Sequence, residues 1–307
     1  MAAELALCIL GVRSRQDLLP NLGNVMDVRS EQAIETGSFA PWTLTLWPPR
    51  SIRIVDWNID RGLQLSGVVE FLSDARADLI ILQEVDLNAR RTHRLNVARE
   101  IAQKLQMNYV FGCEFQELTQ GSRTSPAYHG QATLSPWPLS NPRILRFQRQ
   151  SNFWRPRWYL PEASLFQERI GGRIALVSEV NIAGRPLVTY NLHLESRGDD
   201  GLRCSQLLDC LNDAGQYKSA VPIILAGDLN LDVSRTTTAC SDMSRAQFRN
   251  AFAEQRVRTT PPRSLFDRGS VIDWIFTRGP ITAKQPRVHN SVSASDHYPL
   301  SLTLTFT

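Results

Sequence analysis

Polar side chains that can bind a metal ion or move a proton recur where apolar runs of this 307-residue sequence stop or are interrupted. Asn58 and Asp60 close one such run, and Glu84 closes the next. The remaining residues of this kind are His193, Asp228 with Asn230, Asp273, and Asp296 with His297. Because the ends of strands meet along one edge of a sheet, these distant positions can assemble into a single site.

These residue types suit hydrolysis at phosphorus. Carboxylate and amide oxygens, as in Glu84 and Asn58, are ligands for Mg²⁺, and the ion neutralises charge on a phosphoryl group. His193 and His297 could stabilise developing negative charge or shuttle a proton beside the carboxylates. Taken singly, an Asp or Asn at a strand end is more often a turn former or a cap. The joint pattern is what favours a site.

The apolar periodicity indicates strands alternating with helices. A strand ends at Trp57, a helix fits residues 65–72, and a run buried on both faces leads from Asp78 to Glu84. Two more helices fit residues 98–105 and 204–211, and further strands are predicted at 174–180, 187–194, 221–226, 270–276 and 299–305. So many strands mixed with helices predict an α/β or α+β sandwich, and the chain shows no internal repeat.

Residues 1–48 mix charges with Gly and Pro and lead into Pro48-Pro49, so they are interpreted as a poorly ordered leader or an N-terminal strand wrapped on the domain. Residues 49–307 would form one domain, which a hydrophobic content of 42% can support. A net charge of +4 permits mild attraction to phosphate-bearing partners without requiring it.

The cysteine content and the hydropathy indicate in which cellular compartment the protein is expected. Five cysteines, odd in number and without paired spacing, are typical of a reduced intracellular protein, and we expect a cytoplasmic monomer. No stretch approaches the roughly 20 apolar residues of a membrane span, so we expect no stable membrane insertion.

Six motifs together resemble those of the endonuclease/exonuclease/phosphatase superfamily, in the family's order. They are Trp57-Asn58-Ile59-Asp60, Leu82-Gln83-Glu84-Val85, Asn191-Leu192-His193-Leu194, Gly227-Asp228-Leu229-Asn230, Ile272-Asp273-Trp274-Ile275-Phe276 and Ser295-Asp296-His297. The resemblance covers Ile52 to about Leu304 and implies a DNase I-like four-layer α/β sandwich, with two packed mixed β-sheets flanked by helices. Residues 57–60 and 193–196 are similar to tyrosyl-DNA phosphodiesterase 2.

The resemblance also implies roles. Glu84 would be the main ligand of Mg²⁺ or Mn²⁺, Asn58 would position metal or phosphate, and Asp296 would complete the metal side. Asp228 would orient or deprotonate the attacking water, and Asn230 would hydrogen-bond the scissile phosphate.

For the two histidines, the resemblance implies that His193 and His297 stabilise the transition state or assist the leaving group. Asp273 would fix the tautomer and orientation of His297. Each of these roles follows from the family and not from spacing alone.

Substrate contacts are expected at two places. Gln131 lies where the family often has Asn and is a candidate for a phosphate-side contact. The stretch Asn152–Leu160 interleaves aromatics with arginines, so Trp154, Arg155 and Arg157 could stack on bases and pair with phosphates. The same stretch could equally be a packed loop over a sheet edge.

The leading hypothesis is a metal-dependent phosphodiesterase acting on nucleic acid, DNA or RNA, or on a nucleic-acid adduct. A phosphomonoesterase or phospholipase of the sphingomyelinase or inositol phosphatase kind is the alternative within enzymes, since rim loops decide the substrate. A catalytically silent phosphate- or DNA-binding module is the third hypothesis, and the complete set of acidic and histidine residues argues against it.

Overall fold

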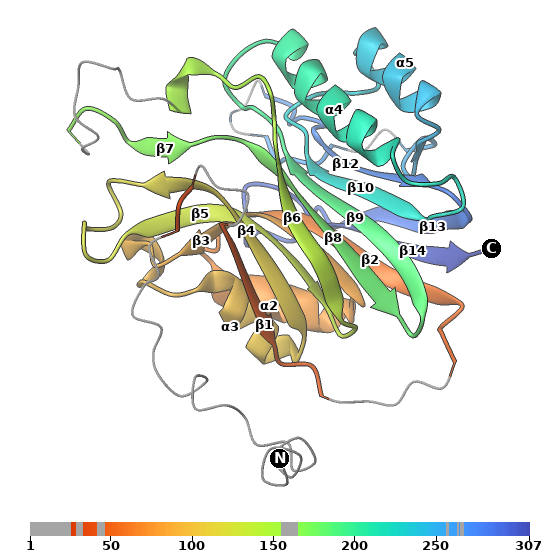
Figure 1. Ribbon diagram of the computed structural model, residues 1–307, viewed down its shortest axis with the longest axis horizontal. Coiled ribbons are helices and arrows are strands. Elements are labelled where there is room, and N and C mark those ends of the chain that lie inside the picture. Colours follow the sequence, from red (N-terminus) through yellow and green to blue (C-terminus); the bar gives the residue numbers. More distant parts are fainter. Residues whose placement is uncertain are drawn as a thin grey trace, which may run out of the picture.

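Two β-sheets pack face to face, and helices cover the outer side of each sheet (Figure 1). The computed structural model describes residues 26–28, 33–41, 47–154, 165–255, 258–262, 264 and 267–307. The four layers are the sandwich expected from the sequence, so the predicted fold is confirmed.

The larger sheet has eight strands and the smaller one six. In spatial order the larger sheet contains β1 (Ile34–Ser38), β4 (Asn108–Glu117), β5 (Ala127–Ser135), β3 (Leu79–Leu87), β2 (Ser51–Arg61), β14 (Leu300–Phe306) and β13 (Ile281–Val288), with β7 (Arg169–Gly171) paired to β4. The smaller sheet contains β11 (Arg249–Asn250), β12 (Asp273–Arg278), β10 (Ile223–Asp228), β9 (Arg185–His193), β8 (Ile174–Ile182) and β6 (Leu139–Arg146). Both sheets are mixed, because β2 runs parallel to β3 and β9 runs parallel to β10.

The helices divide between the two outer faces (Figure 1). They are α2 (Leu65–Ala75) and α3 (Val97–Leu105) on the larger sheet, α4 (Asp200–Ala214) and α5 (Thr237–Arg245) on the smaller one, and the short 3-10 helices η2 (Arg90–Thr92) and η3 (Asn152–Trp154). Side-chain caps begin α3 and α4, where Asn96 accepts from the N–H of Arg99 and Asp199 accepts from that of Leu202. Within the described residues, no helix is long and apolar enough to cross a membrane.

The core between the sheets is built from alternating apolar side chains. Ile52 and Ile54 of β2 face Ile224 and Ala226 of β10, and all four are almost fully buried. Separate apolar clusters join each sheet to its helices. This alternation is the pattern that a strand with different neighbours on its two faces requires.

One predicted strand begins later than expected, and the N-terminal stretch contains a strand, which is one of the two forms expected for it. The strand expected at 270–276 begins only at Asp273, because Ile272 O accepts from the N–H of Leu229 and Ser270 O from that of Thr259. Strand β1, within residues 1–48, pairs antiparallel with β4. Part of the N-terminal stretch is therefore a strand of the larger sheet.

The strand directions bring the polar ends together. The parallel strands β2, β3, β9 and β10 end at the same edge, and the antiparallel strands β12 and β14 begin there. At this edge lie Asn58, Glu84, His193, Asp228, Asp273 and His297.

Candidate active site

Asp228 lies at the centre of the polar cluster. Its Oδ2 accepts a hydrogen bond of 3.1 Å from Asn58 Nδ2. The same oxygen lies 3.7 Å from Nε2 of His193 and 3.8 Å from Nε2 of His297. The structure therefore brings three other predicted residues around the carboxylate of Asp228, although all four are far apart in the sequence.

The backbone around Asp228 fixes where that carboxylate points. Asp228 lies directly opposite His193 on the parallel strand β9, and its Oδ1 accepts from the N–H of Asn230 at 2.9 Å. Gly227, the preceding residue, has φ +139, and a Cβ there would come within 2.0 Å of the carbonyl oxygen of Leu192. Only glycine allows β10 to approach β9 this closely.

Glu84 faces the same space from β3. Its Oε1 lies 3.9 Å from His193 Nε2, and its side chain is 19% exposed. Burial alone would raise the pKa of Glu84, but His129, His193, Arg61 and Arg173 together hold the pKa well below its ordinary value. Glu84 is therefore a carboxylate at neutral pH, in a position to bind a cation.

Asp273 and His297 form a buried pair. His297 Nδ1 lies 2.9 Å from both carboxylate oxygens of Asp273, and His297 O accepts from Trp57 Nε1 at 2.8 Å. Burial lowers the pKa of His297, but the charges of Asp273 and Asp228 and the hydrogen bond to Asp273 raise it to about 10. The ring is thus protonated at neutral pH and presents Nε2 to Asp228.

His193 has a different kind of partner. Arg173 Nη1 lies 2.7 Å from His193 Nδ1 and 2.7 Å from Oε2 of Glu114, and all three side chains are buried. A guanidinium group can only donate and a carboxylate can only accept, so Arg173 and Glu114 make opposite demands on the proton at Nδ1 of His193. Glu114 Oε1 is 3.2 Å from the same Nδ1, and its negative charge compensates the buried arginine.

The other predicted metal and phosphate residues lie at the rim or beside it. Asn58 is 1% exposed, and its Oδ1 accepts from the N–H of Asp60. Asn230 donates one amide hydrogen to Leu194 O at 3.2 Å and has a second. Asp296 is exposed and raises the pKa of His297 and of Asp60, in each case less than Asp273 or burial does.

Two of the predicted substrate residues turn out to be buried. Gln131 is fully buried, with its amide nitrogen donating to Ile174 O and its amide oxygen accepting from Leu176 N. It links β5 to β8 across the two sheets and has no surface for the expected phosphate contact. Trp154 is 2% exposed, and its Nε1 donates to Glu195 at 2.7 Å. The positions of Arg155 and Arg157 lie outside the described residues.

Trp154 instead packs against Arg173, the residue that contacts His193. The guanidinium of Arg173 lies 5.3 Å from its ring centre, and the ring of Phe115 lies 5.0 Å away on tilted planes. Phe115 in turn stacks on His129 at 4.6 Å. This packing supports the arginine that contacts His193, so Trp154 cannot stack on a base in this position.

Two groups of residues could hold a cation. Asp228, Asp273 and His297 offer ligand atoms within 4.8 Å of one another. However, Asp273 and His297 already satisfy each other as a hydrogen-bonded pair. Glu84 is ionised and partly exposed, and its nearest cationic atom is Arg61 Nη2 at 3.6 Å. Glu84 is therefore the better candidate ligand for Mg²⁺ or Mn²⁺, which prefer oxygen donors.

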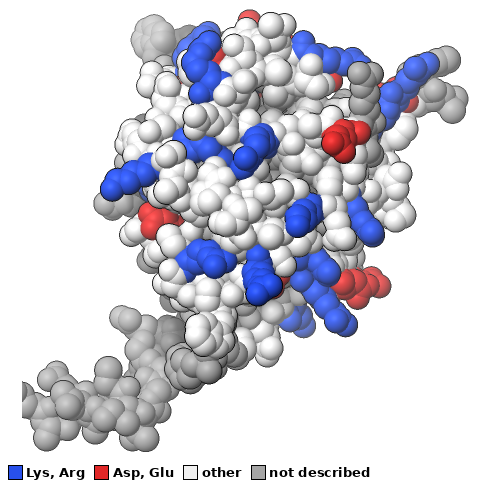
Figure 2. Space-filling view, turned by 90° about the vertical axis from the view of Figure 1, so that its right-hand side faces the viewer, with Lys and Arg blue, Asp and Glu red and all other residues white. Residues whose placement is uncertain are grey.

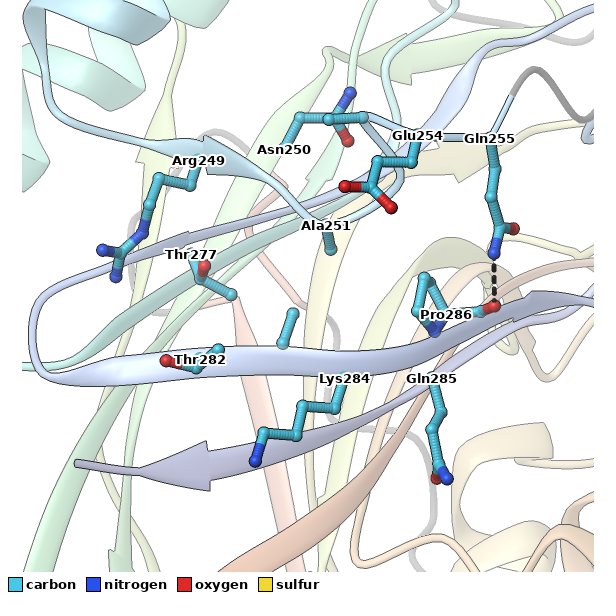
Figure 3. Close-up of a pocket in the computed structure, with 12 residues that line it drawn as sticks. Arg249, Asn250, Ala251, Glu254, Gln255, Thr277, Thr282, Lys284, Gln285 and Pro286 are labelled. Atoms are coloured by element: carbon cyan, nitrogen blue, oxygen red, sulfur yellow. Dashed lines mark hydrogen bonds between the residues drawn. The ribbon is translucent and has the colours of Figure 1, made fainter.

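A groove elsewhere on the surface contains none of the residues predicted from the sequence. A groove of about 640 Å³ between β11 and β13 is lined by Arg249, Glu254, Thr277 and Lys284 among others, and by none of the predicted residues (Figure 3). Lys and Arg side chains are spread across the face of the molecule that carries the C-terminal strands (Figure 2). The positive charge on this face is dispersed over many elements.

The sequence does not single out Glu114, Arg173 or Arg61, although all three are part of the site. Glu114 is a charged residue inside the apolar run of β4, and Arg173 directly precedes the apolar run of β8 after two glycines. A charge inside or next to a buried strand is a signal that could have identified both.

Comparisons with known proteins agree with this geometry. A sequence profile of the Endonuclease/Exonuclease/phosphatase family matches residues 57–297. The sequence has no significant match among curated proteins.

Three solved structures show the same fold at low identity. An endonuclease/exonuclease/phosphatase from Beutenbergia cavernae is 17% identical, with a TM-score of 0.62 over 84% of this chain and 72% of that chain. TDP2 from Caenorhabditis elegans is 18% identical, with a TM-score of 0.54 over 83% and 74% of the respective chains. The human nocturnin catalytic domain, solved with a bound sulfate anion, is 18% identical, with a TM-score of 0.61 over 85% and 97%.

Proposed function

Because the chain belongs to the endonuclease/exonuclease/phosphatase family, we propose that it is a divalent-metal-dependent phosphodiesterase. It hydrolyses nucleic acid, or an adduct of nucleic acid, by attack of water on phosphorus. The observation that carries the proposal is the position of Asp228, whose Oδ2 lies 3.7 and 3.8 Å from the Nε2 atoms of two histidines. At this separation the groups are too far apart for a direct hydrogen bond, and an oxygen atom of water or phosphate beside them could contact all three.

Glu84, Asn58 and Asp296 would hold Mg²⁺ or Mn²⁺. The fit rests on the low pKa and partial exposure of Glu84 and on the oxygen donors that these three residues offer. When bound, the cation would neutralise charge on the phosphoryl group.

Asp228 and Asn230 activate the water and bind the phosphate. Asp228 orients the attacking water and draws its proton, held in place by Asn58 and by the N–H of Asn230. Asn230 donates its second amide hydrogen to a phosphate oxygen.

The two histidines act as hydrogen-bond donors. His297, protonated through its pair with Asp273, donates from Nε2 to the oxygen that carries the negative charge of the leaving group. His193 donates from Nε2 to a non-bridging oxygen, while Arg173 and Glu114 hold the ring at Nδ1.

A second groove, which none of the predicted site residues lines, carries three arginine side chains and bears on the choice of substrate. It has a volume of about 990 Å³, runs past Ile272 next to Asp273, and is lined by Arg235, Arg258 and Arg268. Asp232 and Asp267 also line it, so the arginines leave a modest positive excess. Such a groove can follow a phosphodiester backbone.

The test is hydrolysis of bis(p-nitrophenyl) phosphate and of single-stranded DNA with Mg²⁺ or Mn²⁺. We expect Glu84→Ala and Asp228→Asn to abolish turnover, while Glu70→Gln on the exposed face of α2 serves as the control. Activity that persists in EDTA, or that is unchanged in Glu84→Ala, contradicts the proposal. A parallel panel of p-nitrophenyl phosphate, sphingomyelin and inositol phosphates tests the alternative substrates.

A further inference from the structure

Arg61 ends strand β2 in an unusual backbone conformation. Asp60 and Arg61 have φ values of +42 and +66, and Gly62 follows with +79. A Cβ on Gly62 would come within 2.6 Å of Val97, so the turn depends on glycine. Consecutive non-glycine residues with positive φ are strained, and such strain concentrates at functional sites.

Irregular pairing in two adjacent strands directs Arg61 and Glu84 toward each other. The pairing of β2 with β3 shifts register between Asn58 and Arg61, and that of β3 with β5 shifts between Leu82 and Val85. Glu84, inside the second shift, has φ +52. A bulge re-aims a side chain next to a site, and here two bulges aim at the same place.

The contacts of Arg61 connect the two carboxylates at this end of the site. Its Nη1 forms an ion pair with Asp60, and its Nη2 lies 3.6 Å from Glu84 Oε2. Its side chain is 29% exposed. The other residues that lower the pKa of Glu84 are much less exposed, at 3% for His129, 1% for His193 and 5% for Arg173.

We propose that Arg61 is a substrate-binding residue that receives the non-bridging oxygens of the phosphate ester on the Glu84 side of the site. The planar guanidinium group matches two phosphate oxygens with parallel hydrogen bonds. The carboxylates of Asp60, Glu84 and Asp228 would otherwise repel an incoming anion. The inference rests on the proposed function, since it assigns the anion that reaches the same site.

The rival role for Arg61 is that of a counter-ion for Glu84 and Asp60. The two roles differ in what Arg61→Gln does to each ligand. A counter-ion competes with the cation, so its loss would strengthen Mn²⁺ binding and leave phosphate binding unchanged. Loss of a phosphate-binding residue weakens phosphate binding, because the charge-assisted hydrogen bonds disappear.

The experiment measures binding without turnover. Titration calorimetry with inorganic phosphate at saturating Mn²⁺ is run on the wild-type chain, Arg61→Gln and Arg61→Lys, and electron paramagnetic resonance follows Mn²⁺ binding alone. Arg245→Gln is the control, since Arg245 is 75% exposed and also paired with an Asp, at the C-terminal end of α5.

We expect the Kd for phosphate to rise about 10- to 100-fold in Arg61→Gln, with Arg61→Lys between this variant and the wild type. The KM for bis(p-nitrophenyl) phosphate should rise more than kcat falls. A phosphate Kd within about twofold of the wild type in Arg61→Gln overturns the assignment. Absence of phosphate binding to the wild-type chain overturns it too.

The outcome for Arg61 is distinguishable from the outcome for the proposed function. A chain that binds phosphate through Arg61 but hydrolyses no ester supports the assignment and overturns the proposed phosphodiesterase. If Arg61→Gln does not fold, Arg61→Lys retains the charge and tests the two parallel hydrogen bonds.

Discussion

Replacing Glu114 by Gln should destabilise the fold strongly, although the two side chains have almost the same shape. Glu114 is fully buried, and its Oε2 lies 2.7 Å from Nη1 of Arg173, whose side chain is 5% exposed. The substitution removes the carboxylate that acts most strongly on the buried guanidinium and leaves only the weaker effects of Glu84 and Glu195. Removing one partner of a buried ion pair costs about 3–5 kcal/mol, and because Gln can still accept a hydrogen bond we expect about 3 kcal/mol.

The lowered pKa of Glu114 gives a similar value for the free energy of folding that its charge contributes. Burial raises this pKa, but His193 and Arg173 lower it by more, from 4.5 to about 2. At about 1.4 kcal/mol per tenfold change, the difference corresponds to about 3 kcal/mol. Since the folded-state pKa is the lower one, this stability is fully present above pH 4.5 and is lost as the pH falls through about 2.

Urea unfolding at pH 7 and at a series of lower pH values measures both effects. We expect the free energy of unfolding to drop by about 3 kcal/mol at pH 7, which corresponds to roughly 6 °C in Tm for a chain of this size. The difference between the variant and the wild type should shrink as the pH falls below 4.5. Glu70→Gln on the exposed face of α2 should change stability by less than about 0.5 kcal/mol. A loss below about 1 kcal/mol for Glu114→Gln would refute the compensation of Arg173 by Glu114.

Three further perturbations test the cation site, the histidine pair and the strand contact. Glu84→Ala should lower kcat/KM at least about 100-fold and weaken Mn²⁺ binding measured by electron paramagnetic resonance, and unchanged Mn²⁺ binding would remove Glu84 from the metal side. Asp273→Asn should bring the pKa of His297 down from about 10 toward 6.5, as followed by NMR titration of the ring protons, and a value that stays near 10 would show that Asp273 does not set it. Gly227→Ala should cost about 3 kcal/mol or more in chemical unfolding, because its Cβ would meet the Leu192 carbonyl oxygen at 2.0 Å. Gly184→Ala, at φ +88 with open space around the new Cβ, is the matched control and should cost only about 1 kcal/mol, so equal costs would show that backbone strain alone accounts for the effect.

The elements that the sequence predicts contain continuous or periodic apolar residues, whereas β4 and β5 are just as buried but are not predicted, because glycine and polar residues interrupt them. The runs that become β3 and β10 are apolar because both faces are covered, and their positions are predicted to within a few residues. The edge strand β13 is not predicted, since it contains Lys284 and Pro286 and exposes alternate residues. Charges and proline are the features that protect an edge strand, and they also hide it from a hydrophobicity pattern.

The same reasoning explains which site residues are missed. Motif residues such as Asp228 are predicted because their neighbours in sequence carry the signal. Arg173 becomes part of the site only because β8 lies beside β9, a pairing that no local pattern specifies. Gln131 shows the converse, since its place in a motif does not reveal that its side chain faces the opposite sheet.

The Nδ1 atoms of the two histidines have different partners, which are the carboxylate of Asp273 for His297 and a guanidinium together with a carboxylate for His193. His297 Nδ1 lies against the carboxylate of Asp273, which stabilises the imidazolium form. His193 Nδ1 lies 2.7 Å from the guanidinium of Arg173 and 3.2 Å from the carboxylate of Glu114. Both rings direct Nε2 toward the Oδ2 of Asp228, at 3.7 and 3.8 Å. A hydrolase must both stabilise a phosphate oxygen and protonate a leaving group, and different partners on the two Nδ1 atoms allow the two rings to be tuned separately to these tasks.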